Sequence, residues 1–159
     1  MKSILIIDHG STRAEANHML ACMAGLAQAM AGSAVIVEYA HMELAEPSIS
    51  EGFAACVRRG ASEVVAFPYM LSPGKHSTGD IPRLVAQAAS TFPGVAFTVT
   101  PAFGVHEKLA ELILLRAGVA ARVIDAAQCW EPEGCVGACG AACRVRETYA
   151  EAVRVGEVA

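Results

Sequence analysis

The chain has 159 residues, of which 54% are hydrophobic and 18% charged, and its formal net charge is -4. This length favours one domain with a sizeable buried core, and the apolar content excludes a disordered chain. The small negative charge excludes the basic field that binding to a nucleic-acid backbone requires, so we expect no nucleic-acid partner.

Two stretches long enough to cross a membrane, residues 16–37 and 84–106, lack Asp, Glu, Lys and Arg. Glycine or proline interrupts both, so each is expected to be a helix followed by a strand. The apolar run at residues 4–7 is too short for a secretory leader. We therefore expect a cytoplasmic protein without a membrane partner. In that reducing compartment the six cysteines are expected as thiols or metal ligands.

Four short apolar runs, each followed by a helix-like stretch, predict an α/β fold. The predicted strands are residues 3–7, 34–39, 63–67 and 95–99. Near-continuous apolar strands that alternate with helices are typical of parallel sheets. We therefore expect a single flavodoxin-like domain, with a four-stranded parallel sheet flanked by helices.

The helices between these strands have recognisable start signals. Ser11 or Thr12 is expected to cap the first helix, and Pro47 to lie in the first turn of the second. Pro82 is expected to open the third helix, and a fourth is predicted over residues 106–117. After that helix the apolar period is lost. We therefore divide the chain into an α/β domain, residues 1–120, and a cysteine-rich appendage with a C-terminal helix or tail, residues 121–159.

Reactive side chains follow the predicted strands, where open parallel sheets bind their ligands. His9 directly follows the first strand, Glu43 follows the second, and His76 lies on a long loop after the third. Each histidine also has a structural interpretation: His9 as a helix-entry residue, and His76 as an exposed loop residue. His41 and His106 are expected to cap helices or to lie in the core.

Three motifs in these loops resemble those of the short CbiX/SirB sirohydrochlorin chelatases. They are HGS at 9–11, AHMELAEPSI at 40–49, and PYMLSPGKH at 68–76 followed by DIP at 80–82. The resemblance implies ATP-independent insertion of a divalent metal, Fe²⁺ by preference, into sirohydrochlorin. This agrees with the lack of a Gly-rich phosphate loop in the sequence. The alternatives are cobalt or nickel insertion, or a carrier of metal or tetrapyrrole that performs no insertion.

The resemblance also implies roles for particular residues and a partner. His9 and His76 hold the metal and accept pyrrole protons, tasks that suit imidazole, and Glu43 is a weaker candidate for either task. Short members of this family pair as homodimers. A flat macrocycle rich in carboxylates needs apolar walls and donors at the rim. The wall candidates are Tyr69, Met70, Leu71 and Phe103, and the donor candidates are Ser11, Lys75, Ser77 and Thr78.

A cluster of thiols lies in the appendage at Cys129, Cys135, Cys139 and Cys143. Four thiolates within fifteen residues predict a metal site, either tetrahedral zinc or an iron–sulfur cluster. The plant-type branch of the same family carries a C-terminal cysteine cluster associated with 2Fe–2S, which favours that cofactor, although its cysteines are spaced differently. Redox sensing and hand-over of metal to the cleft are further alternatives. Two other cysteines, Cys22 and Cys56, fall in helical stretches and are expected to be buried.

Overall fold

In the computed structural model of the chain, the described residues are 1–122. The chain divides into two units, Met1–Ala102 and Phe103–Ala159. The first unit holds the sheet, three α-helices, a short 3-10 helix (Gly32–Ala34) and a turn of π-helix (His76–Asp80), and the second contains α4 (Glu107–Arg116). The four clustered cysteines lie outside the described residues, and the predicted domain boundary after residue 120 stays a prediction.

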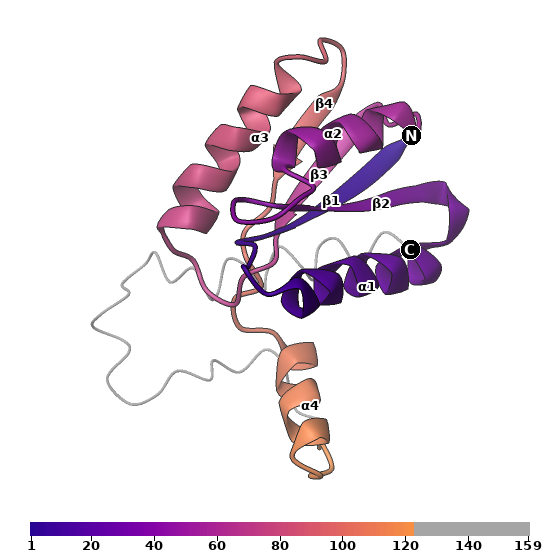
Figure 1. The fold of residues 1–159 in the computed structure, drawn as a ribbon. Coiled ribbons are helices and arrows are strands. Elements are labelled where there is room, and N and C mark those ends of the chain that lie inside the picture. Colours follow the sequence, from indigo (N-terminus) through magenta and orange to yellow (C-terminus); the bar gives the residue numbers. More distant parts are fainter. Residues whose placement is uncertain (123–159) are drawn as a thin grey trace, which may run out of the picture. The chain divides into compact units, whose positions relative to one another are not determined.

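The first unit is built on a parallel sheet. Its strands are β1 (Lys2–Asp8), β2 (Val35–His41), β3 (Glu63–Pro68) and β4 (Ala96–Val99), arranged in the order β2-β1-β3-β4 (Figure 1). Every neighbouring pair is parallel, with Asp8 paired to His41 at the ends of β1 and β2. The predicted α/β fold with a four-stranded parallel sheet is therefore confirmed.

Helices cover both faces of this sheet (Figure 1). On one face, α1 (Ala14–Ala31) packs Leu20 and Ala24 against Ile6 and Val37. On the other face, α2 (Ile49–Arg58) and α3 (Ile81–Ala89) form a larger core that includes Phe53. Burying one large apolar side chain stabilises the fold by about 1.5–3 kcal/mol. Because more such side chains are buried on the second face than on the first, the second face holds the main hydrophobic core.

The start of α2 differs from the sequence prediction. The hydroxyl of Ser48 accepts a hydrogen bond from Glu51 N, and the Glu51 carboxylate accepts one from Ser48 N, which is a capping box. Pro47 therefore lies before the helix, and its predicted place in the first turn is wrong. The prediction for Pro82 is confirmed, because it lies in the first turn of α3.

The start of α1 also differs. Arg13 occupies the cap position and no side chain caps the helix, so the predicted caps at Ser11 and Thr12 are wrong. Asn17 instead reaches back, accepting from Ser11 N at 2.9 Å and donating to Ser11 O at 2.8 Å. A side chain in the second turn thus fixes the loop that leads into α1.

The two cysteines on described helices have different surroundings. Cys56 is buried in α2, as predicted, and burial raises the pKa of its thiol. Cys22 is exposed on α1, so its predicted burial is wrong. The reason is that α1 buries only a narrow strip of its surface, around Leu20 and Ala24.

The two uncharged stretches form α1 followed by β2, and α3 followed by β4, as predicted. Gly32 caps the end of α1, whereas Ser90 caps the end of α3, and Gly94, with a φ of +101°, lies in the turn before β4. None of the helices described over residues 1–122 combines the length and the apolar character needed to cross a bilayer.

The outer edge of β2 is covered by side chains. The amide of Gln28 donates to Val35 O and accepts from Val37 N, both at 2.9 Å, as a neighbouring strand would. Arg59 donates to Val37 O at 3.2 Å and to Gln28 Oε1 at 3.1 Å. These bonds occupy backbone groups that a sheet edge otherwise leaves open.

Candidate active site

His9 and Glu43 lie side by side beyond the carboxyl ends of β1 and β2. Backbone pairing continues past the strands, since Met42 N donates to Asp8 O at 2.9 Å and Glu43 N to His9 O at 3.1 Å. This pairing brings His9 Nε2 within 2.7 Å of Glu43 Oε1. The side chains are 43% and 53% exposed, so the pair faces solvent.

A tight turn at Gly10 makes this arrangement possible. Gly10 has a φ of +84°, a left-handed conformation that favours glycine. A Cβ atom at this position would come within 1.9 Å of the carbonyl oxygen of Glu43. Any larger residue would therefore push the Glu43 backbone away from His9.

His76 belongs to a turn of π-helix, His76–Asp80, that leads directly into α3. The wider turn places Asp80 beside His76, with Nδ1 and Oδ2 2.9 Å apart. Arg83 Nη2 lies 3.9 Å from the other oxygen of Asp80. Single π-helical turns inside helices are frequent at functional sites.

The two histidines predicted to work together face each other. Their ring centroids are 5.1 Å apart and their planes cross at 74°. Each ring also has its own carboxylate partner, Glu43 for His9 and Asp80 for His76. The site is thus two imidazole–carboxylate pairs in edge contact. Within residues 1–122, no three His, Cys, Asp or Glu side chains form a group preassembled to hold a metal ion.

The contacts restrict where protons lie. An ionised Asp80 can only accept, so the nitrogen that faces it, His76 Nδ1, carries the hydrogen, and the lone pair lies on Nε2. A proton must also lie between His9 Nε2 and Glu43 Oε1, because two bare lone pairs 2.7 Å apart would repel. The other nitrogen of His9 lies 3.3 Å from Gly10 O.

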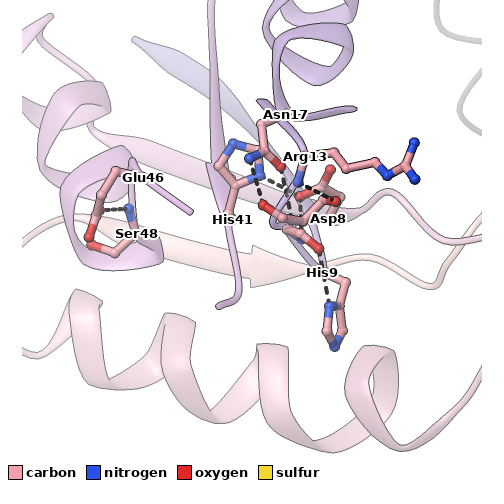
Figure 2. A network of polar contacts seen from close by, with 9 residues as sticks. Asp8, His9, Arg13, Asn17, His41, Glu46 and Ser48 are labelled. Carbon is pink, nitrogen blue, oxygen red and sulfur yellow. Dashed lines mark hydrogen bonds and ion pairs between the residues drawn. The ribbon is translucent and has the colours of Figure 1, made fainter. Parts of the chain in front are cut away.

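A third histidine–carboxylate pair, formed by Asp8 and His41, lies at the ends of β1 and β2 (Figure 2). His41 Nδ1 is 2.6 Å from Asp8 Oδ1, and the His41 side chain is fully buried whereas that of Asp8 is 23% exposed. The same oxygen of Asp8 accepts from Gly10 N at 2.9 Å. His41 is therefore a core residue, one of the two roles expected for it. The other expected role is seen at His106, whose Nδ1 accepts from Lys108 N at the start of α4.

The predicted substrate-binding residues of the third loop have mixed surroundings. Tyr69 and Met70 are half-buried and pack against the two different core clusters, whereas Leu71 is exposed. Ser77 is buried, and its hydroxyl donates to Gly74 O and accepts from Gly74 N, so it holds the loop together. This bonding contradicts the predicted role of Ser77 as a rim donor. The Thr78 hydroxyl likewise donates to Gly74 O at 2.8 Å.

The substrate-binding roles of Lys75, Ser11 and Phe103 stay predictions. Lys75 is exposed on the same loop. The Ser11 hydroxyl accepts from Arg13 N at 3.0 Å, which leaves its proton available for donation. Phe103 belongs to the second unit, so its role as wall stays a prediction.

Two carboxyl groups at the start of α2 share a hydrogen bond. This bond to Glu51 raises the pKa of Glu46, and the same bond, together with bonds from Ser48, lowers the pKa of Glu51 to about 2. Both groups hold Ser48 N, at 2.7 and 2.8 Å. Glu46 and Glu51 therefore shape the loop behind Glu43.

Sequence reasoning missed Asp80, Asp8 and the link between Asp8 and His41. Asp80 follows His76 by four residues, a spacing that brings side chains together only once the segment is known to be helical. Asp8 stands directly before His9, and its partner lies 33 positions further along the chain. That link follows only from the register of β1 with β2.

Comparisons with known proteins identify the family to which this parallel α/β unit belongs. The CbiX family profile matches residues 3–120, and the chain belongs to this family. It is 46% identical over 110 residues to the sirohydrochlorin ferrochelatase, chloroplastic, of Arabidopsis thaliana, covering 69% of this chain and 48% of that protein. It is 35% identical over 118 residues to a sirohydrochlorin cobaltochelatase of Priestia megaterium, covering 73% of this chain and 37% of that protein.

Solved structures give the same fold. The sirohydrochlorin chelatase SirB of Bacillus subtilis subspecies spizizenii, in complex with cobalt, superposes with a TM-score of 0.67 at 31% identity, over 74% of this chain and 50% of that one. A CbiX protein from Marinobacter aquaeolei shares the fold alone, with a TM-score of 0.61 at 22% identity, over 74% of this chain and 95% of that one. The chain thus spans about half or less of the curated relatives above.

Proposed function

We propose that the chain is a sirohydrochlorin chelatase, which inserts a divalent metal into the macrocycle without ATP. One observation carries the proposal: two imidazole–carboxylate pairs face each other across 5.1 Å at the carboxyl edge of the sheet. Insertion must supply a metal ion and remove two pyrrole protons. The two pairs match these two tasks.

His76 is the first ligand of the incoming ion in this proposal. Its Nδ1–H is held by Asp80, which fixes the ring and directs the Nε2 lone pair outward. Imidazole nitrogen suits Fe²⁺, Co²⁺ and Ni²⁺ alike. The metal is the substrate of the reaction, so a weak site that releases the ion serves better than a closed cage.

His9 and Glu43 form the proton-accepting pair. A neutral His9 that donates from Nε2 to Glu43 has its lone pair on Nδ1, 3.3 Å from Gly10 O. The first pyrrole proton taken up on Nδ1 gains that oxygen as hydrogen-bond acceptor, and the Glu43 carboxylate balances the new positive charge. Because both side chains are about half exposed, this proton can pass to solvent, and the same pair then accepts the second pyrrole proton. His9 can bind the metal through Nε2 only after the proton shared with Glu43 has left.

Fe²⁺ is the proposed physiological metal, because the relative with 46% identity is named a ferrochelatase. The test is anaerobic incubation of the full-length protein and sirohydrochlorin with Fe²⁺, Co²⁺ or Ni²⁺ separately, followed by absorbance. We expect the metal-free spectrum to disappear fastest with Fe²⁺. A preference for Co²⁺ would favour the activity named for the Priestia megaterium relative.

The competing proposal is a carrier that binds metal or tetrapyrrole without insertion. It would give a saturable binding signal with sirohydrochlorin, and no faster loss of the metal-free spectrum than in buffer. That result would overturn the enzymatic proposal while leaving the family membership intact.

A homodimer is the proposed assembly. The support is that the chain spans 50% of the Bacillus subtilis SirB structure, so a second copy would supply a second unit of the same kind. Sedimentation equilibrium of the full-length protein tests this, and a monomer at micromolar concentration would contradict it.

The cysteine cluster is the proposed site of a 2Fe–2S cofactor, with zinc as the alternative, and it lies outside the described residues. Its support is the number and close spacing of the thiols at Cys129, Cys135, Cys139 and Cys143. An ultraviolet–visible spectrum of anaerobically purified protein separates the two metals, since zinc thiolates do not absorb visible light.

A cytoplasmic location likewise stays a proposal, which fractionation of the source cells would test.

A further inference from the structure

The buried contact between Asp8 and His41 takes no part in the proposed chemistry, yet it lies one residue away from it. Asp8 ends β1 and His41 ends β2, and the sheet register pairs the two residues directly. Their side chains meet at 2.6 Å, with the imidazole fully removed from solvent. Contacts of this kind in low dielectric are costly to leave unmade.

One carboxylate oxygen connects the core to the active-site turn. Asp8 Oδ1 faces His41 Nδ1 and also accepts from Gly10 N at 2.9 Å. Figure 2 shows Asp8 between the His41 ring and the turn, with the His9 ring pointing away from the buried pair. The position of His9 thus depends on an oxygen that His41 orients.

His41 fixes the other side of the site as well. Its backbone N–H donates to Pro47 O at 2.8 Å, which closes the loop that carries Glu43. Its ring lies in edge contact with Tyr39, at a centroid distance of 5.8 Å. Both halves of the His9–Glu43 pair are therefore tied to one buried residue.

The second ring nitrogen of His41, Nε2, makes a histidine unusual at this buried position. Nε2 is buried and finds no hydrogen-bond partner among residues 1–122. Buried polar atoms normally have partners, and departures from this rule are expected where function requires a particular residue. A Leu would fill the space without an unpaired atom, but it could not hold Asp8.

We propose that Asp8 and His41 are positioning residues that set the distance between His9 and Glu43. This inference rests on the proposed function. The nearby titratable groups are Tyr39, Glu43, Glu46 and Glu51, and the inference requires no change in protonation. It requires only that Asp8 Oδ1 keeps its two partners.

The test compares His41→Leu with His41→Asn in the full-length protein. Asn can place its amide N–H near the position of Nδ1, so it can still donate to Asp8, whereas Leu cannot. We expect His41→Leu to lower kcat for metal insertion by about 10- to 100-fold with little change in KM for the macrocycle, because small displacements of acid–base groups have effects of this size. His41→Asn should recover at least a third of the lost kcat.

Phe53→Leu is the control for a general loss of stability, because Phe53 is fully buried on the opposite face of β1 from α1, where its ring stacks on Phe92 at a centroid distance of 5.8 Å, and it can form none of the polar contacts that Asp8 and His41 make. It should lower Tm while kcat stays within twofold. If His41→Leu fails to fold, Asp8→Leu takes its place: Leu keeps a similar volume but offers no acceptor to His41 Nδ1 or Gly10 N, so it should reduce kcat without a change in KM, whereas Asp8→Asn keeps one oxygen that can accept from both and should retain most of kcat. Equal losses of kcat in Phe53→Leu and His41→Leu would overturn the inference.

A second readout is independent of activity. Imidazole ¹⁵N–¹H spectra of the full-length protein should show shifted His9 ring signals in His41→Leu, signals near the wild-type positions in His41→Asn, and no shift in Phe53→Leu. Unmoved His9 signals in His41→Leu would overturn the positioning role. If the wild-type protein inserts no metal, the proposed function fails, and these spectra still decide the role of His41.

Discussion

Two histidine–carboxylate pairs at the ends of β1 and β2 differ chiefly in burial. Asp8 and His41 meet at 2.6 Å with the imidazole fully buried, whereas His9 and Glu43 meet at 2.7 Å with both side chains about half exposed. The contact distances are nearly equal, so distance does not separate a structural pair from a reactive one. Exposure to solvent separates the two pairs, because only the exposed pair can exchange a proton or a metal ion with a bound substrate.

The largest expected effect is on the exposed histidines. His76→Ala and His9→Ala should each lower metal insertion by more than about 100-fold, as expected for removal of a ligand or an acid–base group. The two variants should differ in Co²⁺ binding without macrocycle: His76→Ala loses it and His9→Ala keeps it. Isothermal titration measures this difference, and His18→Ala, an exposed position on α1, serves as the control. Equal Co²⁺ affinities in both variants would contradict the division of roles.

Gly10→Ala should come next, because it disturbs both pairs at once. The new methyl group would meet Glu43 O and the backbone would be held at an unfavourable φ, so we expect a loss of about 2–4 kcal/mol in unfolding free energy and at least about tenfold in activity. Gly60→Ala is a matched control, since Gly60 also has a positive φ but has nothing within 4 Å of a Cβ atom. Urea unfolding and the insertion assay should separate the two, and full activity in Gly10→Ala would show that the turn tolerates displacement.

Stability should distinguish the buried pair from the exposed one. Asp8→Ala leaves His41 Nδ1 and Gly10 N without their acceptor, which should cost about 2 kcal/mol. Glu43→Ala removes an exposed partner and should cost less than about 1 kcal/mol. Urea unfolding measures both values. Equal losses of unfolding free energy in Asp8→Ala and Glu43→Ala would contradict the expected effect of burial.

The smallest expected effect concerns the carboxyl pair behind the site, and it depends on pH. The pKa of Glu51 is lowered to about 2, so its stabilising effect is present above its unfolded value and is lost as the pH falls through about 2. The pKa of Glu46 is raised, so its stabilising effect has the opposite pH dependence: it is present at low pH and is lost as the pH rises through the folded-state pKa. The Tm difference between wild type and Glu51→Gln should therefore be largest between these two pKa values. A difference independent of pH would exclude the shared hydrogen bond.

The sequence was sufficient to predict the sheet and the convergence of three side chains at one edge of it, because both depend on local pattern. Runs of Ile and Val mark the strands, and the carboxyl ends of parallel strands share one edge. His9, Glu43 and His76 were therefore predicted to converge, and in the structure they do.

What the sequence could not predict depends on register and on local geometry. The partner of Asp8 follows from the exact pairing of β1 with β2. The role of Asp80 follows from a π-helical turn that no residue pattern announces. The Ser77 hydroxyl has the chemistry of a rim donor, and only the fold of its loop shows that it is already hydrogen-bonded to the backbone of Gly74.

The side chain of Gln28 has a consequence for how copies of this chain can associate. By occupying the outward-facing groups of Val35 and Val37, it acts as a substitute for a neighbouring strand. Arg59 and the bond from His41 N to Pro47 O occupy further groups along the same border. These bonds therefore oppose extension of the sheet across β2, and two copies that pair are expected to meet elsewhere.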